Sequence, residues 1–585
     1  MSDLFSFDNQ NELGMVMSVD TSQVFIDVHN SEIMTKLGVG HLVAIKSYSE
    51  YQLLIGTIEK ISRTVTEKLE FEFESDDELV YQDHPNDIVK VVLIGTFKSV
   101  DGEKRNVFKR GADTFPQIDS ESYLIEGDNL QNFMNLISEG IRDSERLKIG
   151  HFINDSTAKA ILNGDKFFQR HASILGSTGS GKSWCVATIL EKASQLDFPN
   201  LIVFDMHGEY SPLTKGNDKI AEGFRIAGPG DLESTDKNVI FLPYWLLNRE
   251  EVLSMILDRN DNNAPNQASR FTLHIKNLKE NTLVRNNKEQ ILKTFTVDSP
   301  IPYQIQDLLM KLQDDDTRKG VGASNKPVKG EWEGKLTRFI SRLEAKVSDR
   351  RYGFLFQPPE QALKYDWLEQ LLYMLLGYSS ERKGIKIIDF SEVPSDVLPV
   401  VTGTLARILY EIQFWMDSNH RTPFTILCDE AHLYLPIKED ANSTERQALE
   451  NFERISKEGR KYGVSLLVVS QRPSDVSKTI LSQCNNFIVL RLTNDRDQSV
   501  VKKLMPDSMK GITDCLPLLD TGEALVLGDS ILLPNRIKLD VPKIKPDSMT
   551  KDFWKEWSKN KPKNESISQA VENLRAQSRK EESEV

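Results

Sequence analysis

The order of apolar and polar residues changes along the chain, and its first part has the pattern of a β-structure. Up to about residue 130, short apolar runs alternate with turn residues such as Asp20-Thr-Ser and Gly38-Val-Gly40. The runs cover residues 14–19, 24–28, 42–45, 53–61 and 88–97. Runs this short and closely spaced predict strands that close into a small barrel, which we place at residues 1–130.

From about residue 150 the pattern becomes one of apolar runs followed by helical periods, which predicts an α/β sheet over residues 150–545. Within it, residues 245–385 contain few strand patterns. Residues 331–347 and 368–376 have the period of helices, so we expect a helical insertion there. Residues 546–585 are polar and charged around Trp554 and Trp557, which predicts a tail that is weakly structured alone.

Composition narrows the class of protein. With 585 residues, 39% hydrophobic and 27% charged, the chain predicts two or three globular domains. No apolar run reaches membrane-spanning length and the start lacks a signal-peptide pattern, so we expect a cytoplasmic protein without a membrane partner. Its four cysteines have no metal-ligand spacing and are expected to be buried free thiols. A net charge of −14 argues against a protein that coats nucleic acid, but it is compatible with a basic pore inside an acidic ring.

The segment Gly176-Ser-Thr-Gly-Ser-Gly-Lys-Ser183 matches the phosphate-binding pattern GxxxxGK[ST] and lies between a predicted strand and a predicted helix. Glycines allow backbone N–H groups to surround phosphates at the helix N-terminus. We expect Lys182 to reach the β- and γ-phosphates of ATP and Ser183 to bind Mg²⁺. The predicted nucleotide contacts are Gly176, Ser177, Thr178, Gly179, Ser180, Gly181, Lys182, Ser183 and Trp184.

A second apolar run, residues 424–428, ends in Asp429 and Glu430. This pattern predicts a buried parallel strand with its acids at the carboxyl end, where ligands bind in open α/β sheets. Asp429 is then predicted to hold the Mg²⁺ shell and Glu430 to polarise the attacking water. The structural alternative is a helix cap with an acidic first turn.

The third run, residues 464–469, is followed by Gln471, which either senses the γ-phosphate and the water or caps the turn. The basic segment before it contains Arg454 and Arg460. Arg460 is our candidate for an arginine that completes a neighbouring subunit's site, with Arg454 as the alternative. Either residue could equally belong to a solvated helix face.

A fourth run, residues 201–204, precedes Asp205-Met-His-Gly-Glu-Tyr210. Asp205, His207 and Glu209 therefore fall at another carboxyl strand end, which favours a place at the edge of the nucleotide site. A structural role is as well supported, since a single histidine at such a position more often serves the fold.

As a set and in this order, these motifs resemble those of the HerA family of hexameric ATPases, which is related to the FtsK-type DNA pumps. The segments that carry the resemblance are 176–183, 205–210, 428–432, 457–463 and 470–474, and residues 522–536 resemble the family's closing hairpin. Met206 stands where the family more often has proline, which casts little doubt on ATP hydrolysis.

The resemblance implies a RecA-like P-loop NTPase core with a helical insertion, an N-terminal barrel that docks a partner, and a tail that braces the next subunit. It also implies a homohexamer with ATP and Mg²⁺ at its interfaces and double-stranded DNA in its channel. The partner is expected to be a nuclease or a sirtuin-like NAD-consuming enzyme, in DNA processing or anti-phage defence.

Three hypotheses remain open at this level. The protein is a motor that translocates on or unwinds DNA, a ring scaffold that activates an effector with ATP as a switch, or a motor for protein or conjugative transport. The retained set of hydrolytic residues favours the DNA motor.

Overall fold

The computed structural model describes residues 4–577 except residues 9, 21–22, 30, 70–80, 102–103, 140, 154–155, 322–326, 378–382, 506, 549–551 and 560–563. The last eight residues of the predicted tail, 578–585, lie outside the described residues. The chain forms two compact units. The first comprises Met1–Lys192, Gln471–Ser474 and Cys484–Pro542, and the second comprises Ala193–Ser470, Asp475–Gln483 and Lys543–Val585.

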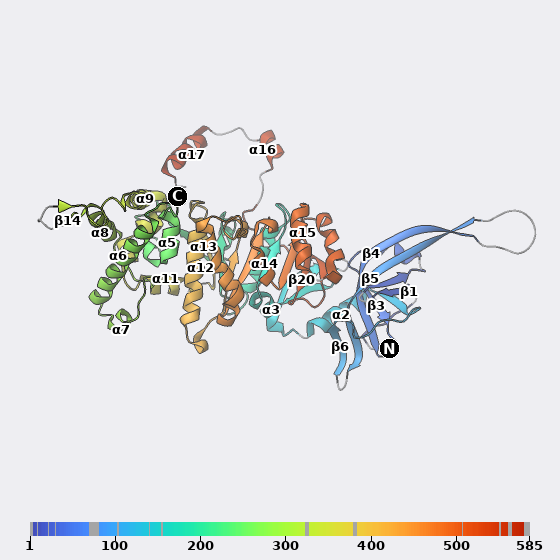
Figure 1. Ribbon diagram of the computed structural model, residues 1–585. Coiled ribbons are helices and arrows are strands. Elements are labelled where there is room, and N and C mark those ends of the chain that lie inside the picture. The colour runs from blue at the N-terminus through green and yellow to red at the C-terminus, as the bar shows by residue number, and fades with distance from the viewer. Residues whose placement is uncertain are drawn as a thin grey trace, which may run out of the picture. The chain divides into compact units, whose positions relative to one another are not determined.

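The N-terminal part of the first unit is a closed six-stranded antiparallel barrel, as the apolar pattern predicts (Figure 1). Its strands are β1 (Glu12–Asp20), β2 (Gln23–Asp27), β3 (Leu42–Lys46), β4 (Gln52–Leu69), β5 (Tyr81–Asp101) and β7 (Glu121–Ile125). They pair in the order β2-β1-β7-β3-β4-β5, and β2 pairs with β5 to close the ring. Strand β6 (Lys104–Arg110) adds to β5 outside the ring. Alternate residues such as Val24, Ile26 and Val91 are fully buried in the interior.

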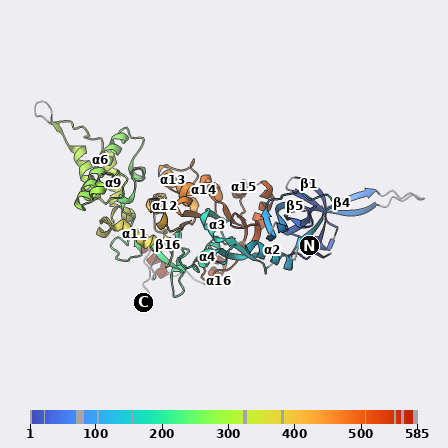
Figure 2. The same ribbon diagram turned by 90° about the horizontal axis from the view of Figure 1, so that it is seen from below.

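Strands β4 and β5 continue beyond the barrel as a two-stranded ribbon (Figures 1 and 2). Their pairing extends without interruption from Ile61↔Val89 to Leu69↔Tyr81. The ribbon is therefore a regular antiparallel extension of the barrel wall.

The remainder of the first unit is built around β10 (Ala172–Leu175), which pairs in parallel with β19 (Asn486–Leu490). From β19 the sheet continues antiparallel through β20 (Glu523–Gly528), β21 (Asn535–Leu539), β8 (Arg146–Phe152) and β9 (Lys159–Asn163). Its helices are α2 (Gly127–Glu139), α3 (Gly164–Gln169), α4 (Lys182–Ala193), α15 (Asp495–Leu504) and the 3₁₀ segment η10 (Asp507–Leu518).

The second unit contains parallel strands in the order β13-β12-β16-β11-β17-β18. They are β11 (Leu201–Asp205), β12 (Ala221–Ile226), β13 (Val239–Ile240), β16 (Ile385–Asp389), β17 (Phe424–Cys428) and β18 (Val464–Ser470). All residues of β11, β17 and β18 are buried, as expected of parallel strands covered on both faces. Helices α12 (Leu398–Trp415), α13 (Ser443–Glu458) and α14 (Lys478–Gln483) belong to this unit.

Between β13 and β16 lie mostly helices, which form a group of their own in both ribbon views (Figures 1 and 2). They are α5 (Arg249–Ile256), α6 (Ala264–Arg285), α7 (Glu289–Leu292), α8 (Ile305–Thr317), α9 (Thr337–Ser348), α10 (Gly353–Phe356) and α11 (Trp367–Leu376). Two strands of two residues each, β14 (Gly320–Val321) and β15 (Pro327–Val328), also pair antiparallel in this region. Helix α9 begins at Thr337 and not at residue 331, because Gly334 has a φ of +75°, which ends any helix that started earlier.

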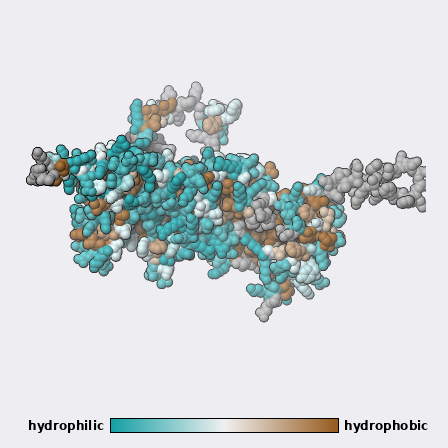
Figure 3. Space-filling view, viewed as in Figure 1, coloured by the Kyte–Doolittle hydropathy of each residue, from teal (hydrophilic) through white to brown (hydrophobic). Residues whose placement is uncertain are grey.

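The C-terminal part of the second unit contains two helices, α16 (Phe553–Lys559) and α17 (Asn564–Ala576). Both leave apolar side chains in solvent; Trp554 is 84% exposed and Leu574 68%. Figure 3 shows such side chains, in brown, on α17. None of the helices in the described part of the chain combines the length and apolar character needed to cross a bilayer.

Candidate nucleotide-binding and hydrolysis site

The P-loop connects β10 to α4, the arrangement that its sequence predicts. Gly179 and Gly181 have φ values of +74° and +104°, which residues with a side chain rarely adopt, so the pattern needs glycine at both positions. Lys182 is the first residue of α4 and is 8% exposed, and its ammonium group donates to the Ser177 carbonyl at 3.4 Å. Ser183 and Trp184 follow in the first turn of α4, where backbone N–H groups and the helix dipole favour a phosphate.

Three other segments of the first unit hold the P-loop in place. The Ser177 N–H donates to the Arg491 carbonyl just after β19, at 2.8 Å. The Gly522 N–H, before β20, donates to the Ser180 carbonyl at 3.0 Å. The Thr178 hydroxyl donates to Gln471 Oε1 at 2.5 Å. Gln471 therefore lies at the P-loop, and its predicted sensing role remains a prediction.

The predicted acids lie in the second unit, at the carboxyl end of β17. Strands β11 and β17 pair with Phe204 opposite Cys428, and the Asp429 N–H donates to the Phe204 carbonyl at 3.3 Å. Asp429 is 3% exposed, and burial together with the nearby carboxylates of Glu430 and Asp205 raises its pKa well above the ordinary value. A bound cation would stabilise the charged form of this buried carboxylate.

Glu430 is the residue predicted to act on water, and its conformation is unusual. Its φ is +42°, a left-handed value that costs free energy in a residue with a side chain. Its carboxylate lies 3.2 Å from Nδ1 of His432, and that ring nitrogen lies 3.5 Å from the Ser470 hydroxyl at the end of β18. The strained backbone and the histidine together fix the direction of the carboxylate.

Asp205, at the end of β11, has a different environment from Asp429. The Asp205 carboxylate accepts the backbone N–H groups of His207, Glu209 and Tyr210 at 3.3, 3.1 and 2.9 Å. Burial raises the pKa of Asp205 to about 6. With its oxygens occupied by the turn, Asp205 organises the residues after β11. The Glu209 carbonyl in turn accepts the N–H of Asp547, which ties the start of the tail to this turn.

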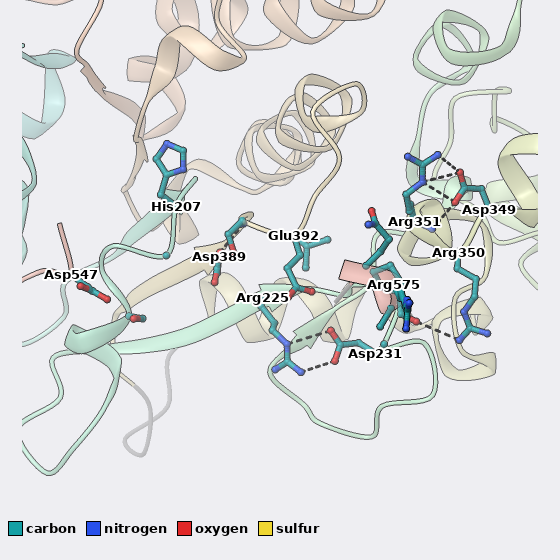
Figure 4. A pocket seen from close by; sticks show the side chains of 18 of the residues that line it. His207, Arg225, Asp231, Asp349, Arg350, Arg351, Asp389, Glu392, Asp547 and Arg575 are labelled. Carbon is teal, nitrogen blue, oxygen red and sulfur yellow. Dashed lines mark hydrogen bonds and ion pairs between the residues drawn. The ribbon is translucent and has the colours of Figure 1, made fainter. Parts of the chain in front are cut away.

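His207 lines a cavity of about 1000 Å³ at the carboxyl ends of β11, β12 and β16 (Figure 4). Its walls carry charges of both signs that pair with each other. Arg225 donates to Asp231 at 2.7 Å, and Arg351 to Asp349 at 2.6 Å. Because these arginines already have carboxylate partners, the cavity differs in chemistry from the P-loop.

The two candidate arginines differ in their surroundings. Arg454 on α13 stacks over the Tyr410 ring at 5.0 Å and lies 3.8 Å from Glu458. Arg460, just after α13, is exposed and has no ion pair or hydrogen bond through its side chain among the described residues. Arg460 is thus the one of the two whose guanidinium group is free.

The side chains present fit Mg²⁺. The Asp429 Oδ2 atom is buried and has no hydrogen-bond partner among the described residues. A hydroxyl in the first turn of a P-loop helix and a single buried carboxylate are the donors that Mg²⁺ uses alongside water and phosphate oxygens. Ser183 in the first unit and Asp429 in the second unit are each such a donor.

Comparison with known families and proteins agrees with this arrangement. Residues 147–409 match the family model "Helicase HerA, central domain". This part of the chain is similar to the central domain of the HerA helicases. The chain is 27% identical to the DNA double-strand break repair helicase HerA of Sulfolobus acidocaldarius, over 67% of this chain and 69% of that protein. It is 26% identical to a probable helicase of Methanocaldococcus jannaschii, over 77% and 76%.

Solved structures of low identity are also similar. VirB4 of Thermoanaerobacter pseudethanolicus aligns with 69% of this chain and 98% of its own, at 15% identity and a TM-score of 0.45. The conjugative coupling protein TrwB aligns with 72% and 93%, at 14% identity and a TM-score of 0.43. The match to the HerA central domain and the P-loop geometry together make this protein a P-loop ATPase with a RecA-like core.

Some residues of the site are not among those predicted. His432 lies in the segment 428–432, which carries the family resemblance, and its position two residues after Glu430 is the sequence signal that could have identified it. Gly522 and Arg491 contact the P-loop through their backbone, which no side-chain pattern in the sequence reveals.

Proposed function

We propose that this protein is a motor that forms a hexameric ring and uses ATP hydrolysis to translocate on or unwind double-stranded DNA. The geometry of Glu430 carries the proposal. A carboxylate held in a strained conformation next to Asp429 and oriented by His432 is suited to activating water, which nucleotide binding alone does not need. The similarity to proteins named as DNA double-strand break repair helicases supports DNA as the substrate.

In this proposal Lys182 neutralises the β- and γ-phosphates of ATP, and Ser183 and Asp429 hold Mg²⁺ and its waters. Glu430 orients the attacking water, and Gln471 reports the state of the γ-phosphate through its contact with Thr178. His207 and Glu209 would border the site from the turn that Asp205 organises.

Two observations support a ring. The unpaired guanidinium group of Arg460 is available to a nucleotide on an adjacent subunit, where an arginine finger stabilises transition-state charge. The exposed apolar residues of α17, Ile567, Val571 and Leu574, share one helix face, as expected of a tail that braces another copy.

The second candidate function is a ring scaffold that activates an effector. The hydrogen bonds that join the barrel to the end of β20 favour this function. Arg110 on β6 donates to the carbonyls of Gly528, the last residue of β20, and of Ile531 and Leu532 in the turn that follows. Residues just before β20, at its other end, contact the P-loop. The barrel is thus connected to the nucleotide site and suits a docked nuclease or sirtuin-like NAD-consuming enzyme, in DNA processing or anti-phage defence.

The test is the dependence of ATP turnover on DNA. A motor that threads DNA should be stimulated by duplex of about 100 base pairs and hardly by duplex of about 10, and the stimulation should fall as salt rises from about 50 to about 200 mM. Glu430→Gln is the control, because it should bind DNA and nucleotide without turnover. Turnover that ignores DNA but responds to a copurifying protein would favour the scaffold.

A further inference from the structure

Two fully buried tyrosines belong to the surroundings of Asp429, and their hydroxyl groups differ. The Tyr434 hydroxyl donates to the Asp429 carbonyl at 3.1 Å. The Tyr210 hydroxyl has no hydrogen-bond partner among the described residues, although Tyr210 is 0% exposed. A buried hydroxyl without a partner destabilises a fold, so its presence indicates a partner that the chain itself does not supply.

Backbone hydrogen bonds hold Tyr210 in the turn that follows β11. Its N–H donates to the Asp205 carboxylate at 2.9 Å, and β11 lies beside β17 through the Phe204 to Asp429 hydrogen bond. Burial, together with the nearby carboxylates of Asp429, Asp205 and Glu209, raises the pKa of Tyr210 well above its ordinary value. The phenol is therefore neutral.

Asp429 Oδ2 is a second buried polar atom that has no hydrogen-bond partner among the described residues. The Asp429 carboxylate oxygen accepts hydrogen bonds, and the Tyr210 hydroxyl can donate or accept, but the two make no hydrogen bond to each other among the described residues. A donor placed between them would satisfy both oxygens. Water bound to Mg²⁺ is such a donor, because the ion keeps several waters and turns their protons outward. One water can donate to both oxygens.

We propose that Tyr210 is a positioning residue of the magnesium site, where its phenol oxygen accepts a hydrogen bond from a water of the ion that Asp429 holds. The inference rests on the proposed role of Asp429 as the magnesium residue. Tyr210 acts through the water and does not touch the nucleotide. Such outer-shell partners set the affinity of a metal ion by fixing the direction of its ligands.

The test replaces the hydroxyl in the full-length protein. For Tyr210→Phe, the Mg²⁺ concentration that gives half of the thermal shift produced by ADP should rise about ten-fold. The melting temperature without nucleotide should stay the same or rise, because an unsatisfied buried hydroxyl is removed. Turnover should recover at high Mg²⁺.

Tyr244→Phe is the matched control. Tyr244 is also buried in the second unit, but its hydroxyl donates to the Tyr303 carbonyl and accepts the Ile305 N–H at 2.9 Å. This variant should melt at a lower temperature and keep the wild-type Mg²⁺ midpoint. An unchanged midpoint in Tyr210→Phe, or a midpoint that shifts in both variants along with melting temperature, would overturn the proposal.

Asp429→Asn in the same assay distinguishes a failure of the magnesium role of Asp429 from a failure of the role of Tyr210. If its midpoint also stays at the wild-type value, the assignment of Asp429 to magnesium fails, and the role of Tyr210 fails with it. If Asp429→Asn shifts the midpoint and Tyr210→Phe does not, only the role of Tyr210 is wrong.

Discussion

Asp205 and Asp429 follow the same pattern in neighbouring strands, yet their surroundings differ. Each comes at the carboxyl end of a buried apolar strand, and burial raises the pKa of both. After Asp205 the chain folds back through Gly208, whose φ is +73°, and three N–H groups reach the carboxylate. After Asp429 comes Glu430 with its left-handed backbone, and Asp429 Oδ2 has no hydrogen-bond partner in the part of the chain that the structure describes. Backbone donors therefore decide which acid serves the fold and which can serve a ligand.

The largest expected effect sharpens this difference at Asp429. Asp429→Asn should lower ATP turnover at least about a hundred-fold, because the Mg²⁺ shell loses its charged partner. Steady-state kinetics measure the loss, and the melting temperature should stay close to that of the wild type. A variant that fails to fold would show that Asp429 is as structural as Asp205.

The next effect concerns stability. Asp205→Ala should cost about 1–3 kcal/mol, since three backbone N–H groups, that of the buried Tyr210 among them, lose their acceptor. The melting temperature, followed by fluorescence, should fall by a few degrees. Turnover should decrease less than in Asp429→Asn. Abolished turnover at an unchanged melting temperature would place Asp205 in the chemistry instead.

The pH dependence of stability tests the same carboxylate. Because the pKa of Asp205 is about 6 in the fold and 3.8 ordinarily, the folded state binds more protons between these values. Its stability should therefore fall as pH rises through that window, by at most about 3 kcal/mol. The gap in melting temperature between wild type and Asp205→Ala should shrink from about pH 4 to about pH 6. A constant gap would mean that Asp205 titrates in the same way in both states.

The smallest effect is expected at Tyr434. Tyr434→Phe removes one hydrogen bond to the Asp429 carbonyl and should cost about 1 kcal/mol of stability. Turnover should stay within a few-fold of wild type, because the Asp429 side chain is untouched. Thermal melts and kinetics on one preparation give both values, and a loss as large as that of Asp429→Asn would make the carbonyl anchor essential.

The sequence predicts the features that depend on contiguous residues, and it does not predict those that depend on contacts between distant residues. The P-loop and the strand that ends at Asp429 are contiguous patterns, and both lie where they were predicted. The distinction between Asp205 and Asp429 depends on φ angles and on donors in the following turns, which an apolar run does not encode. The contact of Thr521 with Gly179 joins residues far apart in the chain, and it is made to a backbone carbonyl. The helical period from residue 331 was misleading, since Gly334 adopts a positive φ before α9.

Strand β20 has one further consequence. Its six residues span about 20 Å, with the P-loop contact of Gly522 just before them and the Arg110 contacts at their end. A hydrogen-bonded strand within a sheet is stiff along its length, so its two ends cannot shift independently. If phosphate release moves the first end, a protein seated on the barrel experiences a different binding surface. By thermodynamic reciprocity that protein must then change the affinity for nucleotide by the same factor.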